Sequence, residues 1–312
     1  MLLPSQYEDG FSRNALPPLA QWPELEFDLP GLQFPNLLNC ADELIRIGTG
    51  IAGGDAPAIV TGQQRITYAG LSELVDRICH VLRQDCSLVP GERVLLRGSN
   101  SPGLLAAWLA VVKSGGIAVT TMPMLRAGEL RKIIAISRPR VAFCEQSLTG
   151  ELEPCLGEAG FERIVGFGAP DSELERLAAA RSAGFTAFPA SQDDVCLIAF
   201  TSGTTGQPKA AMHFHRDVMA ICRTFAQHRL PRCEHPVFSG TPPIGFTFGL
   251  GALLLFPLFM GGAVALPGPM GPQQLAEAVR QFGITHLFTS PTAYRGMLEG
   301  GGLSLPSLKL AV

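Results

Sequence analysis

Short apolar runs alternate with amphipathic segments along most of this chain, and this alternation restricts its fold more than any other feature. Strands are expected at Arg93–Leu96, Ile117–Thr121 and Arg140–Cys144, with helices at Pro102–Lys113 and Ala127–Ile136 between them. Parallel strands need a crossover connection of about a dozen residues, usually a helix. The spacing therefore predicts the α/β class, with wound and largely parallel sheets.

The same alternation resumes at Asp194 after the irregular stretch 168–194. Strands are expected at Val195–Phe200, Val237–Gly240, Ala263–Leu266 and Leu287–Thr289, and helices at Arg216–Gln227, Phe248–Phe259 and Pro272–Phe282. We therefore predict an extended Pro-rich arm over 1–38, a first α/β subdomain over 39–190 and a second over 191–312. A strand at Val312 with no partner element after it predicts that the second subdomain is incomplete and the chain truncated.

Composition excludes several classes of protein. The hydrophobic fraction of 46% is too high for a disordered chain, and a net charge of −3 without any Lys/Arg cluster argues against a nucleic-acid partner. The eight cysteines are scattered and form no C-x-x-C pair, so we expect reduced thiols and no metal site. The first residues include acids where a signal peptide needs basic residues and a long apolar stretch, which predicts a cytoplasmic protein.

The segment 246–266 is almost wholly apolar and is long enough to resemble a membrane span of about 20 residues. Gly249, Gly251, Pro257, Gly261 and Gly262 interrupt it. This spacing of helix breakers favours a buried helix followed by a short buried strand. We expect no membrane partner.

The segment Phe200–Lys209 carries the clearest chemical signal. It follows a buried strand, so its backbone is expected at the carboxyl end of a sheet, where wound α/β proteins bind ligands. Its hydroxyl side chains, its two glycines that allow close backbone approach and the charge of Lys209 suit a polyphosphate. It is no Walker A loop, because Pro208 precedes the lysine and Ala210 follows it.

Thr201-Ser-Gly-Thr-Thr-Gly-Gln-Pro-Lys209, with His215-Arg216 beyond it, resembles the signature of the adenylate-forming superfamily. That superfamily includes acyl- and aryl-CoA synthetases, luciferases and peptide-synthetase adenylation domains. Lys113-Ser-Gly-Gly-Ile-Ala-Val and Pro243–Leu250 resemble further family segments. Trp22-Pro-Glu-Leu and Met212–Asp217 are most similar to benzoate- and 2-aminobenzoate-type CoA ligases.

The resemblance implies the N-terminal domain of such an enzyme and a two-step reaction. ATP and a small-molecule carboxylic acid, here an aromatic one, give an acyl-adenylate and pyrophosphate. The thiol of coenzyme A, a co-substrate, then displaces AMP. The resemblance assigns the phosphates to Thr201, Ser202, Gly203, Thr204, Thr205, Gly206 and Lys209. It makes Lys209 and Thr204 the catalytic residues, with Mg²⁺ sharing the charge.

Two further assignments remain open at this point. His215 matches a family histidine that could contact the nucleotide, but a capping or packing role at a helix start is equally compatible. The resemblance places Phe246, Thr247, Phe248 and Gly249 at an aromatic acyl pocket, with Phe246 as a gate. Periodicity alone would make the two phenylalanines core residues.

Later family motifs have no match in this chain, namely the Tyr-Gly-x-Thr-Glu stretch whose Glu helps to bind Mg²⁺, the ribose-binding Asp and the C-terminal catalytic Lys. We therefore expect the chain alone not to complete adenylation. The alternatives are an inactive nucleotide- or acyl-binding remnant and an adenylation domain that serves a carrier protein. The sequence leaves the oligomeric state open.

Overall fold

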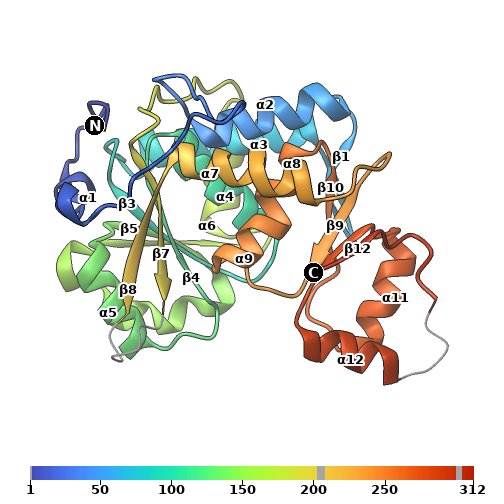
Figure 1. Cartoon of the computed structure of the whole chain (residues 1–312). Helices are drawn as coiled ribbons and strands as arrows, with labels where there is room; N and C mark the ends of the chain where they lie inside the picture. Colours follow the sequence, from blue (N-terminus) through green and yellow to red (C-terminus); the bar gives the residue numbers. More distant parts are fainter. Residues whose placement is uncertain (1, 202–207, 300–303) are drawn as a thin grey trace.

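Two six-stranded sheets form the framework of the molecule (Figure 1). The computed structural model describes residues 2–201, 208–299 and 304–312. In spatial order, sheet I contains β6 (Arg163–Phe167), β5 (Val141–Glu145), β3 (Arg93–Arg97), β4 (Ile117–Thr121), β7 (Val195–Thr201) and β8 (Lys209–Phe214). Sheet II contains β12 (Leu310–Ala311), β11 (His286–Phe288), β9 (Val237–Gly240), β10 (Ala263–Leu266), β1 (Pro57–Thr61) and β2 (Arg65–Thr67).

Neighbouring strands are parallel in both sheets except at one edge of each, where β7 pairs with β8 and β1 with β2 in antiparallel fashion. The central strands β3 and β4 are buried along their whole length. Continuous apolar strands are typical of parallel sheets covered on both faces. The predicted α/β class with largely parallel sheets is confirmed.

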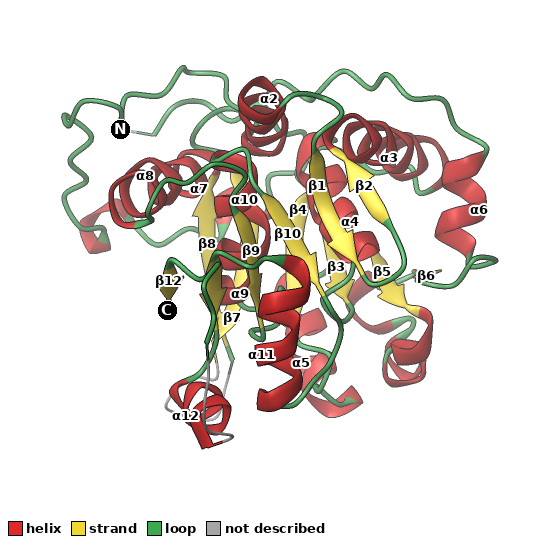
Figure 2. Ribbon diagram, turned by 90° about the vertical axis from the view of Figure 1, so that its right-hand side faces the viewer, coloured by secondary structure: helices red, strands yellow, loops and turns green. Residues whose placement is uncertain are grey.

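A central layer of helices separates the sheets (Figures 1 and 2). This group comprises α2 (Cys40–Ala52), α3 (Tyr68–His80), α4 (Pro102–Lys113), α7 (His215–Ile221), the π-helical η6 (Cys222–Ala226), α8 (Gln227–Arg229), α9 (Thr247–Leu250), the π-helical η7 (Gly251–Leu255) and α10 (Phe256–Phe259). One apolar core joins all of these elements except the short α8 to both sheets, and the indole of Trp108 on α4 is fully buried within it. Burying a large apolar side chain in this way contributes roughly 1.5–3 kcal/mol.

Two outer layers complete the architecture. α5 (Ala127–Ser137) packs on the outer face of sheet I, and α11 (Pro272–Phe282) and α12 (Pro291–Glu299) pack beside sheet II (Figure 2). The remaining helical elements are short: α1 (Phe11–Asn14), η1 (Leu19–Gln21), η2 (Val81–Asp85), η3 (Gln146–Glu151), η4 (Glu153–Cys155), η5 (Glu158–Gly160) and α6 (Glu173–Ala179).

The two sheets do not divide where the sequence analysis placed the subdomain boundary. β1 and β2 lie before residue 190 but belong to sheet II, whereas β7 and β8 lie after it but belong to sheet I. The expected units 39–190 and 191–312 therefore exchange strands. Local periodicity identifies strands but carries no information about which sheet each one joins.

The apolar segment 246–266 forms the buried run from α9 to α10, followed by β10. The prediction of a helix and then a strand is confirmed. None of the helices described in residues 2–201, 208–299 and 304–312 has the length and apolar character that a membrane crossing requires.

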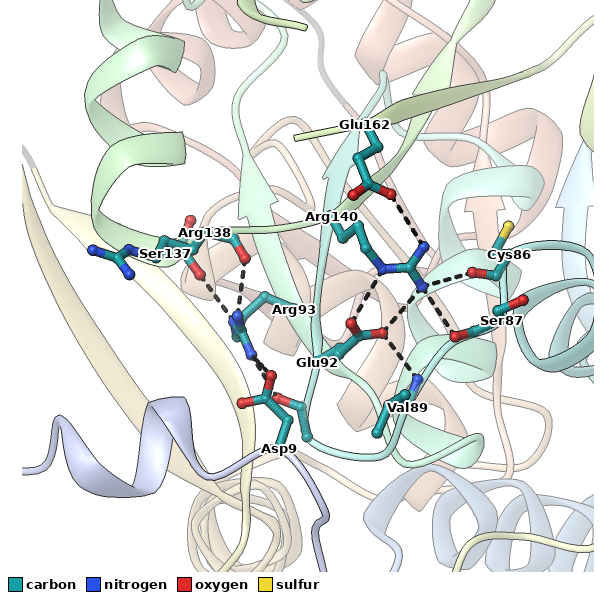
Figure 3. A network of polar contacts seen from close by, with 11 residues as sticks. Asp9, Cys86, Ser87, Val89, Glu92, Arg93, Ser137, Arg138, Arg140 and Glu162 are labelled. Carbon is teal, nitrogen blue, oxygen red and sulfur yellow. Dashed lines mark hydrogen bonds and ion pairs between the residues drawn. The ribbon is translucent and has the colours of Figure 1, made fainter. Parts of the chain in front are cut away.

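Residues 2–39 form an arm whose first part lies against the ends of sheet I strands and whose later part reaches the central helices, where Arg223 of η6 donates to the Gly31 carbonyl at 2.7 Å. Figure 3 shows one attachment: the Asp9 carboxylate pairs with the Arg93 guanidinium at 2.8 Å. The same guanidinium donates to the carbonyl oxygens of Ser137 and Arg138, both at 3.0 Å. The arm is thus held by ionic and hydrogen-bonding contacts at the edge where β3 begins.

Candidate functional site

The β7/β8 hairpin presents the predicted phosphate-binding segment. β7 is an apolar, buried strand up to Ala199, and its pairing with β8 ends where Thr201 lies opposite Lys209. Because β7 runs parallel to β4, the hairpin tip lies at the carboxyl edge of sheet I. Thr201 and Lys209 are both exposed there. Ser202, Gly203, Thr204, Thr205 and Gly206 lie outside the described residues.

A second part of the site follows β9. Phe246 is 43% exposed and Phe248 38% exposed, so neither ring is a core residue at this edge. The Phe248 ring meets Phe288 of β11 edge to face, with centroids 6.1 Å apart. Thr247 is exposed beside them, whereas Gly249 is buried. The two phenylalanines therefore present apolar ring surface outside the core.

Two glycines allow the chain to pass close to its neighbours in this region. A Cβ atom at Gly249 would clash with the carbonyl group of Pro243, and one at Gly245 would clash with the carbonyl group of Thr121 at the end of β4. Any side chain at Gly245 would push the loop before α9 away from sheet I. The closeness of these segments therefore depends on glycine.

Asn100 joins this loop to the end of β3. Its side-chain amide donates to the Pro242 carbonyl at 3.0 Å, and its side-chain oxygen accepts from the Ile244 backbone N–H at 2.8 Å. This partly buried side chain thus forms hydrogen bonds with one backbone acceptor and one backbone donor in the loop after β9 of sheet II. This contact fixes the loop relative to sheet I.

A cavity of about 300 Å³ lies between the carboxyl ends of strands from both sheets. Ser99 and Asn100 line it from the segment after β3, Pro123 from the segment after β4, and Thr241 from the segment after β9. Ligands in open α/β sheets bind beyond the carboxyl ends of the strands. Its position between the sheets makes this cavity a candidate ligand cleft, but the predicted pocket residues Phe246, Thr247, Phe248 and Gly249 do not line it.

A smaller cavity of about 230 Å³ lies beside the hairpin tip and is lined by Thr201, Pro208 and, from α5, Lys132 and Glu129. The segment 122–125 borders both cavities. Arg97, which is only 1% exposed, holds that segment in place through hydrogen bonds. Its guanidinium donates to the carbonyl oxygens of Met122, Pro123 and Leu125 at 2.8–2.9 Å.

His215, a candidate nucleotide contact, is fully buried at the start of α7. Its Nδ1 atom accepts from the Cys40 backbone N–H at 3.1 Å, and its Nε2 atom lies 3.1 Å from the Tyr7 hydroxyl. Both ring nitrogens therefore have partners within the protein. Of the two interpretations left open by the sequence, this geometry favours the packing role.

The buried groups around this histidine have shifted pKa values. Burial raises the pKa of the Tyr7 hydroxyl well above its usual value. Burial also raises the pKa of the Cys40 thiol, but the hydrogen bond with Cys196 and the attraction of His215 lower it more, to about 6. Perturbed pKa values of this kind arise where polar groups are buried together.

Sequence reasoning did not find Asn100, Arg97 or Lys132 as site residues. The contact of Asn100 with the loop after β9 spans more than 140 positions of sequence. Arg97 ends an apolar run and gives no local sign of its three carbonyl partners. Their positions in the sequence gave the one available indication of a site role. Arg97 and Asn100 follow a predicted strand, and Lys132 lies on the predicted helix Ala127–Ile136.

Comparison with known proteins matches residues 52–312 to the family described as AMP-binding enzyme. The chain is 29% identical over 272 residues to the benzoate–CoA ligase of Thauera aromatica, covering 86% of this chain and 52% of that protein. It is 30% identical over 230 residues to the anthranilate–CoA ligase of Pseudomonas aeruginosa, covering 72% and 44%. The chain spans about half the length of these curated relatives.

A solved structure shows the same fold. The anthranilate CoA ligase AuaEII, crystallised in complex with anthranoyl-AMP, superimposes with a TM-score of 0.83 at 24% identity. The match covers 91% of this chain and 56% of that one.

Proposed function

This chain belongs to the AMP-binding enzyme family, and from that premise we propose that it contributes the phosphate-binding hairpin and part of the acid pocket to an aryl-CoA ligase. The substrate class we propose is an aromatic carboxylic acid of the benzoate or 2-aminobenzoate type. The observation that carries the proposal is the β7/β8 hairpin, which places Thr201 and Lys209 together at the carboxyl edge of sheet I.

The geometry supports polyphosphate binding at this hairpin. The exposed ammonium group of Lys209 can pair with a phosphate without first breaking a buried ion pair. In the proposed reaction a carboxylate oxygen of the acid attacks the α-phosphorus of ATP, and pyrophosphate leaves. Lys209 would attract the β- and γ-phosphates and so hold the leaving group in line. We assign no Mg²⁺ ligand among the described residues.

We base the proposed aromatic character of the acid on Phe246 and Phe248. Their partly exposed rings, beside the backbone of Gly245 and Gly249, offer flat apolar surface for an aromatic ring. The benzoate and anthranilate ligases among the relatives support the same class. Coenzyme A as the acyl acceptor is proposed on the same ground.

Substitution of Lys209 tests the proposal directly. We expect Lys209→Ala to weaken binding of ATP and of inorganic tripolyphosphate by at least about tenfold, because one charge-assisted contact is lost. Isothermal titration calorimetry of the 312-residue chain measures this effect. Lys309→Ala, which removes an exposed lysine beside β12, is the matched control. Equal affinities for the two variants would contradict the proposed phosphate site.

A further inference from the structure

Three side chains with metal-binding chemistry meet in the interior, away from the cavities described above. Cys40 begins α2, Cys196 lies on β7 and His215 begins α7, and all three residues have an exposed fraction of 0%. The two sulfur atoms are 3.9 Å apart. The Nδ1 atom of His215 is 3.3 Å from the Cys40 sulfur, and the three potential ligand atoms all lie within 4.8 Å of one another.

These separations suit ligands of a single ion. With zinc bonds of about 2.3 Å to sulfur and about 2.0 Å to nitrogen at tetrahedral angles, the sulfurs of two ligands are about 3.8 Å apart, and a nitrogen and a sulfur about 3.5 Å apart. The observed sulfur–sulfur and nitrogen–sulfur distances, 3.9 and 3.3 Å, are close to both values. The backbone therefore already places the donors at coordination spacing.

The groups around the cluster also suit coordination. The Tyr7 hydroxyl lies 3.1 Å from Nε2 of His215, so it holds the ring with Nδ1 turned toward the sulfurs. A hydrogen-bond partner on the second ring nitrogen is the usual arrangement for a metal-binding histidine. The Cys40 N–H donates to Nδ1 at 3.1 Å, so Nδ1 is the unprotonated ring nitrogen, and its lone pair lies on the side of the ring that faces Cys40. A bound ion would replace the Cys40 N–H as the partner of that lone pair, so this hydrogen bond would break on metal binding.

We propose that Cys40, Cys196 and His215 bind one thiophilic metal ion, Zn²⁺ or Cu⁺. Soft thiolates select these ions, and imidazole suits both. Each thiol releases its proton on binding, and the two resulting thiolates neutralise a divalent ion in this buried position. The N-terminus of α2 favours the negative charge on the Cys40 sulfur.

The ion would join α2, β7 and α7 at the end of the β7/β8 hairpin opposite Thr201. Such a site holds structure together and is independent of the proposed ligase function. Because the ligands are buried beneath Tyr7, the ion would enter while the arm docks during folding. The absence of a C-x-x-C pair argued against a metal site from sequence, but residues 40 and 196 meet only in the folded chain.

Metal content after refolding tests the proposal. The full chain is unfolded with a chelator, refolded with one equivalent of Zn²⁺ or, in a separate anaerobic sample, Cu⁺, and then desalted. We expect one retained ion per chain by mass spectrometric elemental analysis for at least one of the two metals. Cys196→Ser should reduce retention at least tenfold. The control Cys79→Ser alters another buried cysteine, whose thiol faces the Ala110 carbonyl, and should leave retention unchanged.

Cobalt substitution gives a second readout that does not depend on the variants folding. Co²⁺ bound by two thiolates should produce a sulfur-to-metal charge-transfer band with the wild-type chain. The proposal is overturned if neither Zn²⁺ nor Cu⁺ is retained and no such band forms. It is also overturned if Cys196→Ser, shown to be folded by circular dichroism, retains as much metal as the wild type.

Discussion

At the scale of single residues, the site is assembled by side chains that bind backbone groups of distant segments. Asn100 bridges the end of β3 and the loop after β9, and Arg97 supports the segment 122–125 through three carbonyl oxygens. A buried polar side chain with full partners fixes geometry because a displaced partner would lose its hydrogen bond. These residues set the shape of the cleft without adding surface to the polyphosphate site.

The Asn100 bridge leads to a stability prediction. We expect Asn100→Ala to lower the free energy of unfolding by about 1–3 kcal/mol, because the Ile244 N–H and the Pro242 carbonyl lose their partner. Urea unfolding followed by circular dichroism measures the change. Asn14→Ala, at an exposed position of α1, is the control and should change stability by less than about 0.5 kcal/mol. A similar loss in both variants would show that the bridge contributes nothing specific.

His286 on β11 leads to a prediction about pH. Burial lowers the pKa of this histidine below its ordinary value of 6.5, although its hydrogen bond to the Pro231 carbonyl acts in the opposite direction. The unfolded chain therefore binds a proton that the folded chain does not. Stability should fall as the pH drops below about 6.5 toward the lowered folded value.

Comparing variants isolates this contribution. His286→Gln should remove part of the decline in unfolding free energy between about pH 7 and pH 5, measured by urea unfolding at each pH. His228→Gln, at an exposed position of α8, is the control and should keep the wild-type slope. An unchanged slope in His286→Gln would refute the assignment to this residue.

At the scale of elements, the base of the β7/β8 hairpin is fastened to the N-terminal arm. Asp194, immediately before β7, is 1% exposed. Its carboxylate accepts from the Ser5 hydroxyl, from the Gln6 N–H at 3.1 Å and from the Ser191 N–H at 2.8 Å. A buried carboxylate with several donors contributes stability because the donors would otherwise lose their partner.

We therefore expect Asp194→Ala to cost about 2–4 kcal/mol of unfolding free energy. Backbone amides of residues 2–9 and 195–201 should also exchange with solvent faster relative to those of β1 and β10. Hydrogen exchange with mass spectrometry measures this pattern. Asp171→Ala, at an exposed position, provides the comparison. Uniform acceleration across both sheets would mean that Asp194 supports the fold generally and has no specific link to the arm.

The helices and strands also show which elements could be predicted from the sequence and which could not. The strand Arg93–Leu96, the helix Pro102–Lys113 and the strand Ile117–Thr121 were expected from periodicity, and β3, α4 and β4 occupy those positions. β8 was not expected, since Lys209–Phe214 follows a glycine-rich segment and contains two alanines, a residue that is uncommon in strands. Its strand conformation comes from antiparallel pairing with β7, a tertiary contact.

At the scale of the whole molecule, each sheet contains strands from both parts of the chain. The parallel pairs β4/β7 and β1/β10 each join a segment before residue 190 to one after it. The central helices share a single apolar core with both sheets. Neither half of the chain could bury its own apolar surface if it were separated from the other.

This topology predicts the behaviour of a nicked molecule. A protease site engineered into the exposed residues 182–184 should allow cleavage without dissociation, because strand pairs across the cut hold the pieces together. Gel filtration under native conditions should show one species of unchanged size, and in urea the pieces should separate. Two separately folded fragments under native conditions would contradict strand exchange.

The sequence by itself determined what short stretches of chain can fix. Apolar periodicity gave the α/β class and most elements, because burial on one or both faces leaves a local pattern. The run Thr201–Lys209 pointed to phosphate chemistry, because the glycines, hydroxyls and lysine that such a loop needs lie within ten positions. No distant contact is needed for either inference.

Only the tertiary structure decided which distant segments meet. It assigned β1 and β2 to sheet II and β7 and β8 to sheet I, set Asn100 against Ile244, and brought Cys40 beside Cys196 and His215. The physical reason is that strand pairing and core packing depend on surfaces contributed by many elements at once. A local pattern records that a residue is buried, but the identity of its neighbours is settled only when the whole chain packs.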